Sequence, residues 1–357
     1  MLAKQEKNIP QEVNIVENNT NNEVKKGKNI LSGMGIHLAL IIAIVLILGI
    51  SAYKLFSWNK GEVILLDPTE DTSEFDVEVL DEILPLTNEA AADHVYDDET
   101  RILLLGNGDL TVSEGTDSSL AGYIANATGA TVYNGSFMTV SMASRHPHMI
   151  EQNYPDDIYS LPYIADAICT GDFSEMDRIT EEYYEYGVMT QRAVDLLKSI
   201  DYDNLDVIVI MYDSQDYFQQ RPIENPKDEL EISTYMGALK YAVREIQETY
   251  PYIRIIVSSM FYSKGFNEAG DEYDPDMMNF NNGTISNYIY HGLQACSDLS
   301  VTFLDNFYGT INQNNHRQYI DYDTYKMYKY VALTDAGRQE LAKRIAYAVE
   351  TFPNDKK

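Results

Sequence analysis

The stretch LLLGNGDLTVSEG, residues 103–115, runs from an apolar segment straight into a glycine turn. The apolar residues predict a buried β-strand that ends at Gly106, and the turn continues as Gly108-Asp109-Leu110-Thr111. A carboxylate therefore follows the predicted strand almost at once. Because open α/β sheets carry their sites at the carboxyl ends of the strands, this turn is where a functional site is expected.

Further short apolar runs follow along the chain, separated by amphipathic stretches. Such alternation predicts a parallel sheet with helices on both faces. The predicted strands are Ile102–Leu105, Thr131–Tyr133, Val207–Met211, Ile253–Ser258 and Val301–Leu304. We therefore predict a flavodoxin-like three-layer α/β/α sandwich with a five-stranded parallel sheet.

The stretches between these strands show the spacing of helices. The predicted helices are Ser118–Ala127, Ile158–Cys169, Glu175–Ser199, Ser233–Thr249, Ile285–Cys296 and Thr334–Thr351. The last is the clearest, because Leu341, Ile345 and Val349 recur on one face. Thr334 is a good N-cap for that helix, and Gly129 is expected to end the first one.

Four segments, in order along the chain, resemble the sequence blocks of the SGNH (GDSL-type) hydrolases. They are RILLLGNGDLTVSEG (101–115), ATVYNGSFMTVS (130–141), LDVIVIMYDSQDYF (205–218) and YKYVALTDAGRQELAKRIA (328–346). Their order and their helix and strand context follow the family pattern. The resemblance implies an esterase fold, with acyl groups on carbohydrate or lipid as the class of substrate.

The chain departs from that family at all three members of the catalytic triad. The family's serine attacks the acyl carbon, its histidine takes the proton, and an aspartate three residues before the histidine orients it. Aligning the strand ends puts Gly108 at the serine, and aligning GDLT instead leaves the serine deleted before Leu110. Ala332 stands at the histidine and Lys329 at the aspartate. Because triad members act as a unit, we expect a pseudoenzyme, a retained fold whose mechanism is lost.

Other parts of the family site have counterparts here. Asn134 matches the asparagine of the second block, and Thr139 stands where the oxyanion-hole glycine is expected. Gln215 and Asp216 stand for the Asn-Asp of the third block. We expect Asp109 and Asp216 to bind sugar hydroxyls, with Gln215 as a donor. The predicted pocket comprises Asn107, Gly108, Asp109, Asn134, Thr139, Gln215 and Asp216.

Two residues are candidates for a relocated mechanism. Ser113 follows the turn within a few residues, and His146 in SRHPHM follows the second predicted strand. A loop serine and a surface histidine are the simpler interpretations. A serine or histidine within hydrogen-bond reach of the turn Gly106–Leu110 would instead favour an active carbohydrate O-acyl esterase or acyltransferase.

The amino-terminal part of the chain predicts a membrane anchor. No residue from Asn29 to Tyr53 carries a full charge, and a bilayer needs roughly 20 such apolar residues. Lys25, Lys26 and Lys28 precede this run, which favours a cytoplasmic amino terminus. The predicted parts are a disordered cytoplasmic tail (1–28), a transmembrane helix (29–56), an acidic stalk (57–100) with one short strand at 78–84, and an extracellular SGNH-like domain (101–357).

The amino-acid composition limits the kinds of partner and ligand that this protein is expected to bind. The chain has 26 Lys and Arg against 56 Asp and Glu, a formal charge of −30, which repels nucleic acid. Cys169 and Cys296 form no CxxC pair. The runs DYDNLD (201–206) and DEYDPD (271–276) lack the glycine and the closing glutamate of a calcium loop. We predict no metal and no cofactor, and as partners the membrane and a cell-envelope carbohydrate or protein.

Tyrosine is unusually frequent, with 28 residues against one tryptophan, as in YDTYKMYKY (322–330). Such side chains suit sugar rings or protein partners, and they also cover helix faces. Three functions stay open at this point. We favour a protein that binds or scaffolds envelope carbohydrate without catalysis. The alternatives are the active esterase and a structural partner module of an envelope complex, which a large exposed tyrosine-rich patch would favour.

Overall fold

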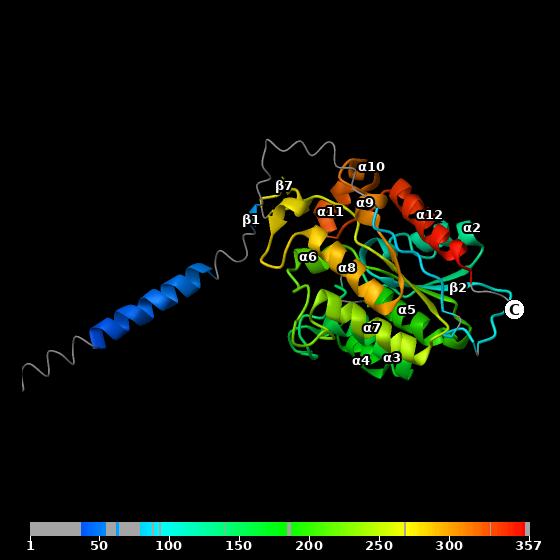
Figure 1. The fold of residues 1–357 in the computed structure, drawn as a ribbon, viewed down its shortest axis with the longest axis horizontal. Helices are drawn as coiled ribbons and strands as arrows, with labels where there is room; N and C mark the ends of the chain where they lie inside the picture. Colours follow the sequence, from blue (N-terminus) through cyan, green and yellow to red (C-terminus); the bar gives the residue numbers. More distant parts are fainter. Residues whose placement is uncertain are drawn as a thin grey trace, which may run out of the picture. The chain divides into compact units, whose positions relative to one another are not determined.

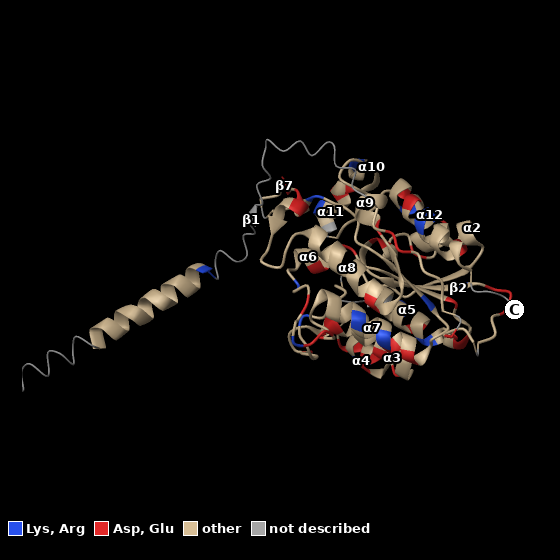
Figure 2. Cartoon of the chain, in the orientation of Figure 1, with Lys and Arg blue, Asp and Glu red and all other residues tan. Residues whose placement is uncertain are grey.

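The computed structural model describes residues 37–54, 62–63, 79–87, 89–92, 94–138, 140–183, 187–267, 269–328 and 330–353. The chain divides into two compact units, Met1–Lys60 and Gly61–Lys357. In the first unit a helix covers His37–Lys54, drawn in blue in Figure 1. Its mean hydropathy is 2.1, and Lys54 is its only Lys, Arg, Asp or Glu (Figure 2). This helix is long and apolar enough to cross a membrane.

A five-stranded parallel sheet forms the centre of the second unit, in the order β3-β2-β4-β5-β9. Its strands are β2 (Arg101–Gly106), β3 (Thr131–Asn134), β4 (Val207–Met211), β5 (Arg254–Ser258) and β9 (Thr302–Leu304). All five strands expected from the sequence are present, and the predicted fold class is confirmed. The strand order reverses between β2 and β4, so the topological switch point lies at the carboxyl ends of these two strands.

Helices cover both faces of this sheet (Figure 1). One layer holds α2 (Leu120–Thr128) and α12 (Asp335–Thr351), and the other holds α3 (Leu161–Thr170), α4 (Ser174–Glu182), α5 (Gly187–Ser199), α7 (Tyr235–Thr249) and α8 (Ile285–Leu299). Successive strand residues serve opposite layers, because side chains alternate along a strand. Leu103 and Leu105 join the core beneath α7, while Ile102 and Leu104 join the core beneath α12.

The helix ends follow the local chemistry, with one correction. Thr334 caps α12 through its side-chain oxygen, and Gly129 ends α2 in the left-handed conformation with φ 71°. The single helix predicted over Glu175–Ser199 is wrong, because α4 ends at Glu182 and α5 begins at Gly187. The residues between them, 183–186, are mostly tyrosine, a residue type with lower helix propensity than Leu, Glu or Lys.

Short elements connect the layers. The helices among them are α6 (Gln215–Phe218), α9 (Asn306–Gly309), α10 (His316–Tyr319), α11 (Tyr322–Tyr328), and the 3₁₀ turns η2 (Gly108–Thr111), η3 (Pro155–Tyr159), η5 (Tyr202–Asn204) and η6 (Pro275–Met277). Two pairs of short strands are antiparallel. One pair is β1 (Glu62–Val63) with β8 (Met278–Asn279), and the other is β6 (Gly265–Phe266) with β7 (Glu272–Tyr273). Several of these elements follow the carboxyl ends of the central strands.

Residues 79–87, here called the edge segment, pack along β9. Glu82 and Phe303 exchange two backbone hydrogen bonds of 2.9 Å in an antiparallel bridge. The N–H of Leu84 donates to Thr302 Oγ1 at 3.0 Å. Leu80 and Ile83 pack against the two cores, one each. The sequence predicted an acidic stalk over residues 57–100 with one short strand at 78–84, and the edge segment lies against β9 in this part of the chain.

Candidate functional site

The side chain of Asn107 joins the ends of β2 and β4 at the switch point. Its amide donates to Asp213 Oδ1 at 2.9 Å and to the carbonyl of Val140 at 2.7 Å. Its oxygen accepts from the backbone N–H of Asp213 at 2.8 Å. With 1% of its surface exposed, Asn107 fixes the two strand ends to each other and leaves no polar atom for a ligand.

Gly108 follows with a left-handed backbone, φ 54°, which glycine adopts without strain. A Cβ atom at this position would lie 2.9 Å from Asp213 Oδ2. This is the position that the strand-end alignment matches to the family's serine. The carboxyl group of Asp213 therefore occupies the space into which a side chain at residue 108 would project.

Asp109 ties this turn to the segment before α12. Its Oδ1 accepts from the N–H of Leu333 at 2.7 Å and lies 3.4 Å from the guanidinium of Arg338. Its Oδ2 is buried without a hydrogen-bond partner in the described part of the chain. Burial raises the pKa of Asp109 to about 7, although Leu333 and Arg338 oppose the shift. The carboxyl of Asp109 is thus a clamp between the first and last sequence blocks.

Asp213 and Asp216 are the other buried acids at this place, and they differ in how they are paired. Asp213 Oδ1 accepts from Asn107 and from the N–H of Gln215, whereas its Oδ2 has no partner within the described residues. Both oxygens of Asp216 accept backbone N–H groups, from Met142 and Ala143, at 2.9 Å. Burial raises the pKa of each carboxyl to about 6. Asp216 therefore holds the loop after β3, while Asp213 keeps one unused oxygen.

The remaining predicted pocket residues are placed as follows. The amide of Asn134 donates to the carbonyl of Leu110 at 2.6 Å and so holds the backbone of the turn. Gln215 begins α6 and lines a cavity described below. Ala332 is 3% exposed and its carbonyl accepts from the N–H of Asp321. Thr139 and Lys329 lie outside the described residues.

Among the described residues, Ser113 and His146 form no hydrogen bond with the turn Gly106–Leu110. Ser113 is exposed, with φ 54°, and its carbonyl accepts from Thr116. The ring of His146 lies 5.3 Å from that of Tyr154. Within the described residues, none of the hydrogen bonds of residues 106–110 involves a serine hydroxyl or a histidine ring. The geometry brings together acids and amides here, and no nucleophile with its base.

Comparison with solved structures finds proteins of low sequence identity to this chain. No protein-family model and no curated protein matches the chain. An aryl esterase of M. smegmatis is 16% identical, with 71% of this chain and 99% of that one covered and a TM-score of 0.37. A carbohydrate acetylesterase of Sinorhizobium meliloti is 13% identical (71% and 99%, TM-score 0.38). A protein described as a GDSL-like lipase of Bacteroides ovatus is 11% identical (71% and 100%, TM-score 0.42).

An aromatic cavity of about 250 Å³ opens beyond these strand ends, and we call it the strand-end cavity. Its walls come from α6, β6, β7 and α11, which meet at one end of the body in Figure 1. The rings that line it are Phe218, Phe266, Tyr273, Tyr325 and Tyr330, and its polar lining is Asp213, Gln215 and Gln219. Phe266 and Tyr325 meet edge to face, with ring centroids 5.2 Å apart. The switch point therefore carries an apolar cavity with few polar groups, as ligand sites do.

The sequence had not indicated most of this lining. Asp213 is not among the predicted pocket residues, and the five rings come from four separate segments. Tyr325 and Tyr330 lie in the tyrosine run YDTYKMYKY, which was the one available signal. Residues that converge from distant segments leave no spacing pattern in the sequence.

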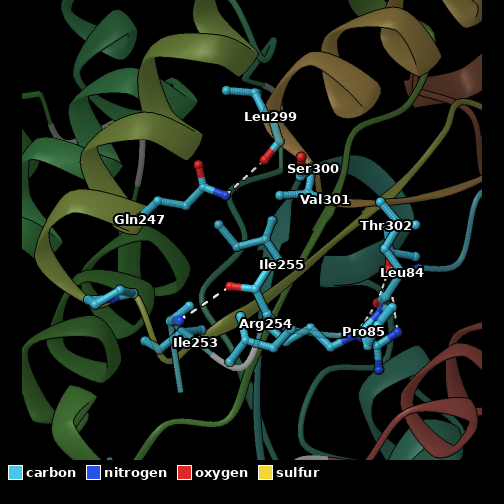
Figure 3. A pocket seen from close by; sticks show the side chains of 14 residues that line it. Leu84, Pro85, Gln247, Ile253, Arg254, Ile255, Leu299, Ser300, Val301 and Thr302 are labelled. Carbon is cyan, nitrogen blue, oxygen red and sulfur yellow. Dashed lines mark hydrogen bonds between the residues drawn. The ribbon is translucent and has the colours of Figure 1, made fainter. Parts of the chain in front are cut away.

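A second cavity, of about 190 Å³, lies at the opposite, amino ends of β5 and β9 (Figure 3). There the guanidinium of Arg254 donates to the carbonyls of Leu84 at 3.1 Å and Phe352 at 2.8 Å. Gln247 donates to the carbonyl of Leu299 at 3.1 Å. Because these polar groups already bind the backbone, they hold the edge segment and the end of α12 in place. We therefore assign the candidate ligand site to the strand-end cavity.

Proposed function

We propose that this chain is a membrane-anchored carbohydrate-binding protein with an esterase-like fold and without an ester-hydrolysing mechanism. The observation that carries the proposal is the carboxyl of Asp213 beside Gly108, in the space of the family's serine side chain. Acyl transfer needs hydrogen-bond donors where negative charge develops on the substrate oxygen. A buried carboxylate at that place repels such an oxyanion, so it opposes the chemistry of the family.

The strand-end cavity supports carbohydrate as the ligand class. Aromatic rings stack on the apolar face of a sugar, while amide and carboxylate groups bind its hydroxyls. This cavity combines five rings with Gln215, Gln219 and Asp213. Its volume of about 250 Å³ lies just below the range of roughly 300–1,000 Å³ that is usual for ligand pockets, and so suits a small ligand such as a single sugar ring.

The helix His37–Lys54 would hold this domain at a membrane. Lys25, Lys26 and Lys28 on its amino-terminal side favour a cytoplasmic amino terminus, with the cavity outside the cell. A domain in that position meets the carbohydrates of the cell envelope, which makes them the expected source of the ligand.

The test measures hydrolysis and binding on the full chain in detergent. A chromogenic acetate ester and acetylated sugars serve as substrates, with a fluorophosphonate probe to label any activated serine. We expect no turnover and no label. Saturation transfer from the protein to neutral and N-acetylated hexoses, followed by NMR, is expected to detect binding. The variant Phe218→Leu should weaken binding, because it keeps apolar volume and removes a ring from the cavity.

The matched control is Tyr290→Leu on α8, a residue 61% exposed and absent from the cavity lining, which should leave binding unchanged. Turnover with a labelled serine would overturn the proposal in favour of an active esterase. Binding that Phe218→Leu and Tyr290→Leu reduce equally would show that sugars attach elsewhere on the protein.

A further inference from the structure

The strand-end cavity has an electrostatic property that carbohydrate binding alone does not require. Among the described residues, its lining includes one acidic residue, Asp213, and no Lys or Arg. Asp213 is 4% exposed, and one of its carboxylate oxygens has no hydrogen-bond partner within the described residues. A buried carboxylate that no cation neutralises is costly, so a ligand that supplies positive charge here gains more than a neutral one.

The buried acid Asp109 differs from Asp213 in having a cation beside it. Asp109 is equally buried, but the guanidinium of Arg338 lies 3.4 Å from its Oδ1 and supplies a positive charge. The partners of Asp213 are the neutral amide of Asn107 and backbone N–H groups. Within the described part of the chain, the acid that lines the cavity is thus the one without a cation beside it.

The aromatic rings of the cavity also favour a positively charged ligand. The face of an aromatic ring attracts a cation, and aromatic cages bind ammonium groups. At the rim, Lys326 Nζ already lies 4.8 Å from the ring centroid of Phe266, on an exposed side chain that also reaches Glu272 at 3.9 Å. The ring of Phe266 therefore already has one ammonium group against it, outside the lining of the cavity.

The amides at the cavity supply the neutral part of the recognition. Gln219 Nε2 donates to Gln215 Oε1 at 3.1 Å, which fixes the two side chains to each other. Gln215 Nε2 donates no hydrogen bond to any other described residue, so this N–H group can bind a ligand hydroxyl. A ring with both hydroxyls and one ammonium group satisfies the amide and the carboxylate at once.

We propose that the strand-end cavity binds a hexose with a free, protonated amine, with the ring against the aromatic walls and the ammonium group directed to Asp213. This inference rests on the proposed carbohydrate-binding function and names its ligand class. N-acetylation removes the positive charge from the sugar nitrogen, so an N-acetylated hexose lacks the group that Asp213 would neutralise.

The experiment compares glucosamine, N-acetylglucosamine and glucose by calorimetry on the full chain in detergent, at about pH 7. We expect glucosamine to bind about tenfold or more tightly than the other two, as a charge-assisted hydrogen bond contributes ~1.5–3 kcal/mol. Asp213→Asn keeps the shape and the acceptor for Asn107 and removes the charge. It should abolish the preference for glucosamine, so that the affinities of the variant for the three sugars agree within about twofold.

The outcomes separate this inference from the function on which it rests. Equal affinity of the unaltered protein for all three sugars would overturn the amine preference while carbohydrate binding stands. Binding of none of the three would overturn the amine preference, and binding of no hexose in the wider panel would overturn both. A preference for glucosamine that survives in Asp213→Asn would place the ammonium group elsewhere, and a far-UV circular dichroism spectrum of this variant would verify that it is folded.

Discussion

The carboxyl of Asp213 should cost the fold stability at neutral pH, and replacing it with an amide should recover that stability. Burial raises the pKa of Asp213 to about 6, from an ordinary value of ~3.9. A carboxyl whose pKa is raised by folding does not lower the free energy of unfolding while it is protonated in both the folded and the unfolded protein. Its cost grows as the pH rises between these two values and is complete above the higher one. Asp213→Asn should therefore stabilise the protein at high pH and not at low pH.

The magnitude follows from the two pKa values. At pH 7.5 the buried charge costs about 3 kcal/mol, and at pH 5 about half of that. The assay is urea unfolding of the full chain in detergent, followed by far-UV circular dichroism at both pH values. The control is Asp117→Asn on an exposed loop, which should change the free energy of unfolding little at either pH. A gain for Asp213→Asn that is equal at both pH values, or a loss at pH 7.5, would refute an uncompensated charge at this position.

Two further substitutions test the packing that surrounds the site and the sheet. Gly108→Ala should cost about 1 kcal/mol more than Gly129→Ala, because both pay for a left-handed backbone but only residue 108 gains a Cβ 2.9 Å from Asp213 Oδ2. Equal urea midpoints would mean that the carboxyl moves aside freely. Arg254→Leu should cost about 3 kcal/mol, since it strips buried backbone carbonyls of their donor. On the surface, Arg244→Leu loses an exposed ion pair and should cost under ~1 kcal/mol in the same urea unfolding experiment.

The sheet was predictable because each strand carries its own signal. A parallel strand covered on both faces is apolar along its length, so VIVIM at 207–211 needs no context to be recognised. The short elements after the strands have no such signal. Phe266 lies in a two-residue strand, and its partner strand is equally short, so neither has room to show a period.

The site residues could be predicted from the sequence only at positions that belong to the family motifs. The resemblance identified the turn at Gly108 and the acids at 109 and 216, but it could not show which acid binds a backbone N–H and which keeps a free oxygen. The bond from Leu333 to Asp109 joins residues 224 positions apart, and Asn107 meets Asp213 across 106 positions. Such pairings depend on how strands are ordered and where side chains point, which a single sequence does not contain.

The edge segment covers β9 and so limits the pairing of other chains with this edge of the sheet. A β-strand at the edge of a sheet offers unpaired peptide groups, to which a strand of another chain can add. In this protein the peptide groups of Phe303 are bonded to Glu82 of the edge segment instead. A shortened chain that began at Arg101 would expose β9 along this edge. If such a shortened chain aggregated, the cause would be the loss of the nine residues 79–87 that cover β9, and not instability of the remaining domain.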